Sequence, residues 1–589
     1  MFLQIISAIQ IAYDPSADST LKRQAFDYVN QLRQEPSAWQ PCLNISLQTP
    51  RQSPVIRVFC LDIVNNAVQA GLVDQQGLKT IKEQLMAYLQ QFYGISGQQD
   101  TPDSGNIVNK FAQTITFLFS SFYGSGWETC FDDLLALTIS QTGSRDNYPG
   151  IVFYLTVLNS IHDEIGDQLL SRSRAEQDRA NTLKDLIRER DVQKIARSWE
   201  EILTRWRISN DVVAELCLKA VGKWVSWVDI SFVVNQQMLA LLFQQLERAQ
   251  KVNPRIGEEL ARDAAIDVFT ETVAKKMPNA DKINMITFLN LENVVSQLVT
   301  CPPLRDSRAS NYDVDLAETV AKLVNTSVVD IVKVLETENP TSPTWAKAEQ
   351  LLGLFLPHLL RFFSDIFDEV CSTVLNAMND VLAFLRRASG GESVSPQRAA
   401  MLLPILKAIF TKMRYDDTAD WGQEDEQTDE AEFQDLRKRL AALQSAIAST
   451  DEQLYIDAIS TLVHDTFQRL RAEGSQLNWR DLDLALHEVY LMGDLAVKGG
   501  GLYQKNKPNS PAAEKLVRMM LEMVQSSENN CHPATILANP LQIRVHLLML
   551  RYSYNTWKSA SGTVPSLKSK PTTSNQYCKI FCILPIIKA

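Results

Sequence analysis

Apolar residues recur every three or four positions along most of this chain, and short polar or proline-containing breaks separate these segments. Between 151 and 165 the apolar residues follow spacings of 4, 3, 3 and 4, which places them on one face of an α-helix. Segment 352–370 is apolar over more than half of its circumference, as expected for a helix that is covered on two sides. Alternating patterns typical of strands are nearly absent. The sequence therefore predicts an all-α fold.

The breaks divide the first quarter of the chain into short helices that can pair. Prolines follow polar residues at Asp14-Pro15, Glu35-Pro36 and Thr49-Pro50, where helices end. The expected helices are 3–12, 19–34, 37–47, 54–70, 74–93, 105–122, 128–140 and 149–165. Their pairs repeat with a period near the ~40 to 47 residues of HEAT or armadillo arrays. Because one pair cannot bury its apolar face alone, the pairs must stack. The predicted fold is a HEAT-repeat superhelical solenoid, an α-α superhelix.

Composition narrows the possible partners. Apolar residues make up 45% and charged residues 22%, so a large core can form, and the net charge is −11. A chain this acidic binds an anionic partner only through a local basic face, which argues against a simple DNA-coating protein. The nine cysteines contain no CxxC pair, so neither a zinc site nor a redox motif is expected. No apolar run reaches the ~18 to 20 residues of a membrane span, and no membrane insertion is predicted.

Catalytic motifs are missing from the sequence. No phosphate-binding GxxxxGK[ST] loop is present. His487-Glu488 begins like a zinc-protease helix, but Leu491 stands where the second histidine ligand is required. We therefore expect no enzyme activity, no metal and no cofactor of the protein's own.

Cations are concentrated between 172 and 207. We single out Lys184, Arg188, Arg190, Lys194 and Arg197 as candidate phosphate-binding residues, because a guanidinium can bind two phosphate oxygens at once. Acidic residues alternate with them, so a solvated helix face with i,i+4 ion pairs is the competing interpretation. The tryptophans at 199, 206, 224 and 227 have helical spacing, which favours core packing over base stacking.

Several segments interrupt the helical rhythm. Residues 302–313, 388–397 and 499–511 are expected to be loops. Residues 416–432 carry nine carboxylates and are expected to form an acidic loop. This loop is either merely solvated, a contact for a basic partner, or an internal competitor of anionic cargo. Residues 555–589 are rich in Ser, Thr, Lys and Pro and are expected to form an irregular tail. Either the array is cut short before this tail, or this end comes from an altered reading of the gene.

Six segments resemble exportin-T, the tRNA exportin of the importin-β or karyopherin superfamily. They are AIQIAYDPSADSTLKRQAFDYVNQLRQEPSAWQPCL from position 8, VFCLDIVNNAV at 58–68, NKFAQTITFLFSSFYGSGWETCFDDLL at 109–135, NTLKDLIRERDVQKIARSW at 181–199, KMRYDDTADWGQEDEQTDEAEFQDLRKRL at 412–440 and NWRDLDLALHEVYLMGDLA at 478–496. The resemblance covers roughly residues 1–550. It implies a monomeric receptor that shuttles between nucleus and cytoplasm. Such a receptor binds tRNA cooperatively with Ran-GTP, contacts nucleoporins, and leaves the GTP chemistry to Ran.

The resemblance also implies a division of the chain. Residues 1–125 would form the Ran-binding repeats and residues 126–415 the exportin-like repeats, followed by the acidic loop at 416–432, further repeats at 433–554 and the tail. In this family the second helices of the first repeats grip the GTPase. On the two corresponding segments, the polar residues among apolar faces are Asp62, Asn65, Asn66, Asn109, Lys110 and Gln113, which we take as candidate Ran contacts.

Two other functions remain open. A HEAT-repeat scaffold would hold proteins together without Ran. A karyopherin for protein cargo would bind Ran-GTP but release its cargo on doing so, and would not bind tRNA.

Overall fold

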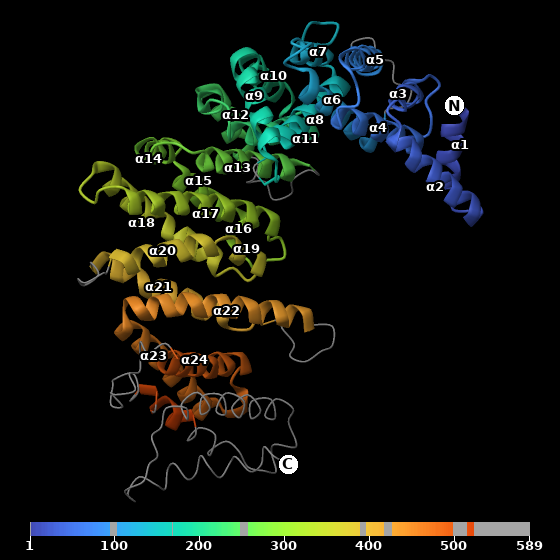
Figure 1. Cartoon of the computed structure of the whole chain (residues 1–589). Helices are drawn as coiled ribbons and strands as arrows, with labels where there is room; N and C mark the ends of the chain where they lie inside the picture. The colour runs from blue at the N-terminus through green and yellow to red at the C-terminus, as the bar shows by residue number, and fades with distance from the viewer. Residues whose placement is uncertain are drawn as a thin grey trace, which may run out of the picture. The chain divides into compact units, whose positions relative to one another are not determined.

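The computed structural model describes residues 2–94, 103–167, 169–247, 257–388, 396–417, 427–498, 515–516 and 518–523 (Figure 1). All regular elements within these ranges are helices, so the predicted all-α class is confirmed. The chain divides into two compact units, one of residues 1–278 with 297–305, the other of residues 279–296 with 306–589.

The first unit consists of short helices in sequence order. They are α1 (Phe2–Tyr13), α2 (Ser19–Gln34), α3 (Trp39–Leu47), α4 (Pro54–Gln69), α5 (Gln75–Tyr93), α6 (Gly105–Phe122), α7 (Cys130–Leu137), α8 (Tyr148–Ile165), α9 (Arg174–Arg190), α10 (Val192–Trp206), α11 (Asp211–Val225), η1 (Ile230–Phe232), α12 (Gln236–Glu247), α13 (Glu258–Ala274) and α16 (Pro302–Arg305). The expected helices 19–34 and 105–122 have the observed bounds. The expected helix 128–140 is shorter, because the Thr138 hydroxyl bonds the Leu135 carbonyl oxygen as the helix ends.

Local capping explains why the helices begin where they do. The Asp18 side chain accepts hydrogen bonds from the backbone of Thr20 and Leu21 at the start of α2. At α9, Ser173 and Glu176 form a capping box, in which each side chain binds the other residue's backbone N–H. These contacts satisfy amide groups that have no partner inside a helix.

Two layers make up the first unit. Along one layer, α4 packs on α6, α6 on α8, α8 on α11, and α11 on α13, while α3, α5 and α7 pack in sequence in the other. Figure 1 shows these layers between α3 and α8. This is the stacked helix-pair arrangement that the period predicted.

The tryptophan cluster belongs to the core of the first unit. Trp199 and Trp224 are fully buried, and their rings meet edge to face with centroids 6.0 Å apart. The Trp224 indole donates to the Leu158 carbonyl oxygen at 3.0 Å. Core packing is therefore confirmed for these two tryptophans, whereas Trp206 and Trp227 are half-buried.

Longer helices form most of the second unit. They are α14 (Asn279–Phe288), α17 (Val314–Thr337), α18 (Pro343–Phe363), α19 (Asp368–Thr373), α20 (Leu375–Ala388), α21 (Pro396–Met413), α22 (Gln427–Thr450), α23 (Glu452–Glu473), η4 (Gly474–Gln476) and α24 (Trp479–Lys498), while α15 (Leu291–Thr300) contributes residues to both units. Here too α17, α20 and α22 pack in sequence, beside α18, α21 and α23.

Two expected loops are partly helical. Pro302 begins the short helix α16 inside the expected loop 302–313, since proline fits the first turn of a helix. The expected acidic loop 416–432 becomes α22 from Gln427 onward, because glutamates have good helix propensity and carboxylates are favoured near a helix N-terminus. The central parts of loops 388–397 and 416–432, all of 499–511, and the tail 555–589 lie outside the described residues. Within the described ranges, none of the helices combines the length and apolarity of a membrane span.

Candidate functional site

Four of the six candidate Ran contacts meet between α4 and α6. Lys110 forms an ion pair with Asp62 and donates to Gln113 Oε1 at 2.7 Å. The same Gln113 oxygen accepts a hydrogen bond from Asn65 Nδ2 at 3.3 Å. Two of these contacts link α4 with α6, whose paired residues are 48 positions apart in sequence, and the third lies within α6. The sequence pattern alone did not predict these contacts.

The exposed part of this network can meet a partner. The Asp62 side chain is 34% exposed and that of Lys110 is 19% exposed. Asn66 and Asn109 are exposed beside them, and neither forms a side-chain hydrogen bond within the described part of the chain. Asn65 is buried, and its Oδ1 accepts no hydrogen bond from the described residues. The surface therefore offers unused donors and acceptors next to a fixed ion pair.

Polar contacts continue along the same layer of helices. The Thr116 hydroxyl on α6 donates to the Ser160 hydroxyl on α8 at 2.8 Å. Asn159 on α8 donates to the Leu216 carbonyl oxygen on α11 at 3.2 Å. Our sequence analysis missed these residues, because isolated Thr, Ser and Asn residues in helices give no signal in sequence. They show that the layer containing Asn65 has polar contacts at three successive helix interfaces.

Two of the five candidate phosphate-binding cations lie in a positive region on α9. Arg188 Nε donates to the Trp227 carbonyl oxygen at 2.9 Å, and its guanidinium lies 5.6 Å from the centroid of the Trp227 ring. Arg188 also forms an ion pair with Asp185. The pKa of Lys184 is lowered, first by burial and then by the positive charges of Arg188 and Arg172. Lys184 therefore sits in a field that favours an anion.

Two further candidates hold the α9–α10 hairpin in place. Lys194 Nζ lies 2.7 Å from Asp132 Oδ1 and 2.7 Å from Asp191 Oδ1. The Arg190 guanidinium lies 4.6 Å from the centroid of the Tyr123 ring. Lys194 is thus paired with acidic residues, as the competing interpretation expects, although neither pair has i,i+4 spacing, and Arg190 contacts an aromatic ring. Arg197 is exposed and has no side-chain partner among the described residues.

Three cations that are not among the five candidates lie outside α9 in the first unit. Arg172 donates to the Glu164 carbonyl oxygen at 2.6 Å, and Lys223 pairs with Asp163 at 2.6 Å. Lys275 donates to the carbonyl oxygens of Val225 and Val228. Its pKa is lowered by burial and then by the charge of Arg188. Lys275 lies too far from α9 in sequence for any local pattern to connect it with Arg188.

Comparisons with known proteins show which sequences and structures this chain is similar to. A family model described as Exportin-T matches residues 342–546, and one described as Exportin 1-like protein matches residues 104–269. Exportin-T of Aspergillus oryzae is 59% identical over 555 residues, which are 93% of this chain and 53% of the relative. Exportin-T of Aspergillus terreus is 60% identical over 539 residues, 91% of this chain and 52% of the relative. The chain thus spans about half the length of the curated relatives it matches.

A solved structure supports the fold. "Importin13 cytosolic state" matches with a TM-score of 0.52 at 12% identity, over 84% of this chain and 59% of the other. Identity this low is informative about architecture alone. The predicted HEAT-repeat solenoid class is confirmed.

Proposed function

This chain is a homologue of the exportin-T proteins over 93% of its length, and from that premise we propose that it is a nuclear export receptor for tRNA. The observation that carries the proposal is the 59% identity over 555 residues with a protein of that name. In this proposal the receptor binds tRNA together with Ran-GTP, crosses the nuclear pore in contact with nucleoporins, and releases the tRNA in the cytoplasm. It acts as a monomer and shuttles between the two compartments.

We assign the contact with Ran to the polar face of α4 and α6. Asp62 and Lys110 are partly exposed, and the exposed Asn66 and Asn109 flank them. A paired aspartate and lysine that are already fixed lose little side-chain entropy on binding. The GTP and its hydrolysis belong to Ran, so the receptor needs no cofactor of its own.

Contact with tRNA is assigned to Lys184, Arg188 and Arg197. The first two lie in the positive region of α9, and Arg197 is exposed on α10. RNA duplexes are recognised mainly through phosphates and shape, so binding should weaken steeply with salt. Arg190 and Lys194 are assigned to the α9–α10 hairpin itself, because Tyr123, Asp132 and Asp191 occupy them.

Cooperativity follows if both ligands favour the same arrangement of the stacked helices. A ligand shifts a conformational equilibrium only through its different affinities for the two arrangements. By linkage, Ran-GTP and tRNA must then strengthen each other's binding by the same factor.

The test is a gel shift with labelled tRNA, with no Ran, with Ran locked on GTP and with Ran locked on GDP. We expect Ran-GTP to tighten tRNA binding by at least about fivefold and Ran-GDP to have no effect. Lys184→Gln with Arg197→Gln should lower the affinity and flatten the salt dependence by about 0.9 per lost phosphate contact. The control is Lys79→Gln, an exposed lysine on α5. Equal effects of both Ran forms would contradict the proposal.

A karyopherin for protein cargo is the second candidate. The pairing of Arg188 with Asp185 and of Lys194 with two aspartates favours it, because these cations are already partly neutralised. In that case Ran-GTP would displace the cargo, and tRNA would bind no more tightly in its presence. A scaffold would respond to neither form of Ran.

A further inference from the structure

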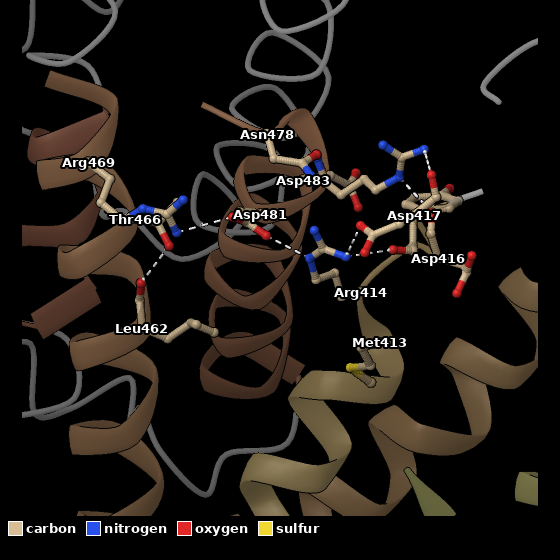
Figure 2. Close-up of polar contacts among 12 residues, drawn as sticks. Met413, Arg414, Asp416, Asp417, Leu462, Thr466, Arg469, Asn478, Asp481 and Asp483 are labelled. Carbon is tan, nitrogen blue, oxygen red and sulfur yellow. Dashed lines mark hydrogen bonds and ion pairs between the residues drawn. The ribbon is translucent and has the colours of Figure 1, made fainter. Parts of the chain in front are cut away.

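Three arginines and three aspartates meet where α21, α23 and α24 come together in the second unit. Figure 2 shows Asp481 between Arg469 and Arg414. Its Oδ2 lies 3.1 Å from Arg469 Nη1, and its Oδ1 lies 2.6 Å from Arg414 Nε. The Asp481 side chain is 21% exposed. Asp481 therefore joins the ends of α21 and α23 to the first turn of α24.

The start of the acidic segment lies on the other side of Arg414 (Figure 2). Arg414 Nη1 lies 2.9 Å from Asp417 Oδ1. Arg480 donates from Nε to the Asp416 carbonyl oxygen at 2.6 Å and from Nη2 to the Asp417 carbonyl oxygen at 2.9 Å. Arg414 thus holds Asp417 by its carboxylate, and Arg480 holds Asp416 and Asp417 by their backbone carbonyl oxygens.

Asp417 lies close to several positive charges. Its pKa is lowered, first by the hydrogen bond and the charge of Arg414 and then by the charges of Arg480 and Arg308. Arg308 is exposed, and its side chain forms no ion pair within the described part of the second unit. Arg414 therefore contacts the Asp417 carboxylate directly, Arg480 contacts the backbone of the same segment, and Arg308 adds positive charge nearby.

The two aspartates that Arg414 binds differ in how easily they can be replaced. Asp481 is mostly buried and bridges two arginines, whereas the Asp417 side chain is 57% exposed. Exposed ion pairs contribute little to stability, because water solvates both charges well. An external anion can therefore take the place of Asp417 while Asp481 keeps the helices together.

We propose that Arg414 and Arg480 form a phosphate-binding site for the RNA backbone, to which the charge of Arg308 contributes and which Asp417 occupies in the free protein. A phosphate is a better ligand than a single carboxylate here, because its oxygens can accept from more than one guanidinium fork. As part of the same chain, Asp417 competes at high effective concentration. It therefore selects for ligands that carry several phosphates and against isolated anions. The inference deepens the proposed function, on which it rests for naming RNA as the ligand.

The experiment compares Asp417→Asn with Asp435→Asn in the full chain. Asp435 is a matched control, since it is exposed and pairs with Lys438 at 2.6 Å on α22, outside the arginine cluster. The probe is a fluorescently labelled oligouridylate, followed by anisotropy over a range of salt concentrations. We expect Asp417→Asn to bind about threefold more tightly than the wild type, with a salt slope steeper by about 0.7. Asp435→Asn should match the wild type.

Variants that remove a positive charge test the arginines of the site directly. Arg308→Gln and Arg480→Gln should weaken binding of the oligouridylate, and Arg23→Gln, an exposed arginine on α2, should not. Equal affinities of Asp417→Asn and Asp435→Asn for the oligouridylate would contradict the proposed phosphate-binding site.

A second experiment with labelled tRNA distinguishes failure of the phosphate-binding site from failure of the proposed export function. If no variant binds tRNA but the oligouridylate follows the expected order, the site stands and the export function fails. If tRNA binds equally to both aspartate variants, the function stands and the site is refuted.

Discussion

Glu488 on α24 is a carboxyl group buried in the core of the second unit. It is fully buried. Its Oε1 accepts a hydrogen bond from Gln444 at 2.9 Å, while Oε2 has no hydrogen-bond partner among the residues that the structure describes. Tyr455 on α23 binds the same Gln444, and the ion pair of Arg437 with Asp483 lies beside it. Burial raises the pKa of Glu488 to about 8 from its ordinary value of 4.5, against the smaller opposing effects of Gln444 and Arg437.

Stability should therefore fall as pH rises through the neutral range. The folded state holds the Glu488 proton more tightly than the unfolded chain does, so the proton stabilises the fold. This contribution is complete below pH 4.5, declines between 4.5 and 8, and is gone above 8. We expect Glu488→Gln to be more resistant to urea than the wild type at pH 9, because it buries no charge there. The measurement is the urea midpoint at pH 6 and at pH 9.

Glu452→Gln is the control for this prediction, since Glu452 is exposed in the first turn of α23. It should leave the pH dependence as in the wild type. A wild-type midpoint that rises between pH 6 and pH 9, with Glu488→Gln behaving in the same way, would contradict the assignment.

At the scale of elements, one carboxylate fixes the start of α6. The Asp103 side chain is 3% exposed, and its Oδ1 lies 2.6 Å from Arg57 Nη1 on α4. It also accepts hydrogen bonds from Tyr93 at 2.9 Å and from Tyr88 at 3.3 Å, both on α5, and pairs with Arg51. Burial alone would raise the pKa of Asp103, but the bond and charge of Arg57 outweigh it and lower the pKa. The contacts join three consecutive helices.

Replacing this aspartate should loosen all three helices. Asp103→Ala leaves Arg57 buried without its counter-charge, a change that costs about 3–5 kcal/mol in other buried pairs. Asp62→Ala, which breaks a partly exposed pair, should cost no more than about 1 kcal/mol. Hydrogen exchange of α4, α5 and α6 measures the difference. Equal protection in both variants would show that the Asp103 cluster does not hold the helices together.

At the scale of the whole molecule, stability should be local. In a stacked array each helix pair contacts only its neighbours, so the chain need not unfold in one step. Phe467 on α23 is fully buried, and Phe467→Ala should cost about 3–5 kcal/mol in its surroundings. We expect faster hydrogen exchange in α22, α23 and α24 and no change in α4, α6 and α8. A uniform increase across both sets of helices would contradict this.

Part of the candidate site could be predicted from sequence. The pattern of polar residues on otherwise apolar helices was enough to select Asp62, Asn65, Lys110 and Gln113, which the fold brings into one network. The cation-rich segment 172–207 was recognised from sequence. Which of its cations are paired within the protein and which are available to a ligand was not. Lys194 neutralises Asp132, 62 residues away, and no local pattern records such a partner.

The sequence by itself determined the helices and their pairing. Periodicity and capping act within a few residues, so the bounds of α2 and α6 could be read from the sequence. Only the tertiary structure decided which charges are neutralised and which are left to a ligand. Arg414 meets Asp481 across 67 positions, and Lys275 lies in the field of Arg188 on α9. Electrostatic fields depend on distance in space, and stacking determines that distance independently of separation along the chain.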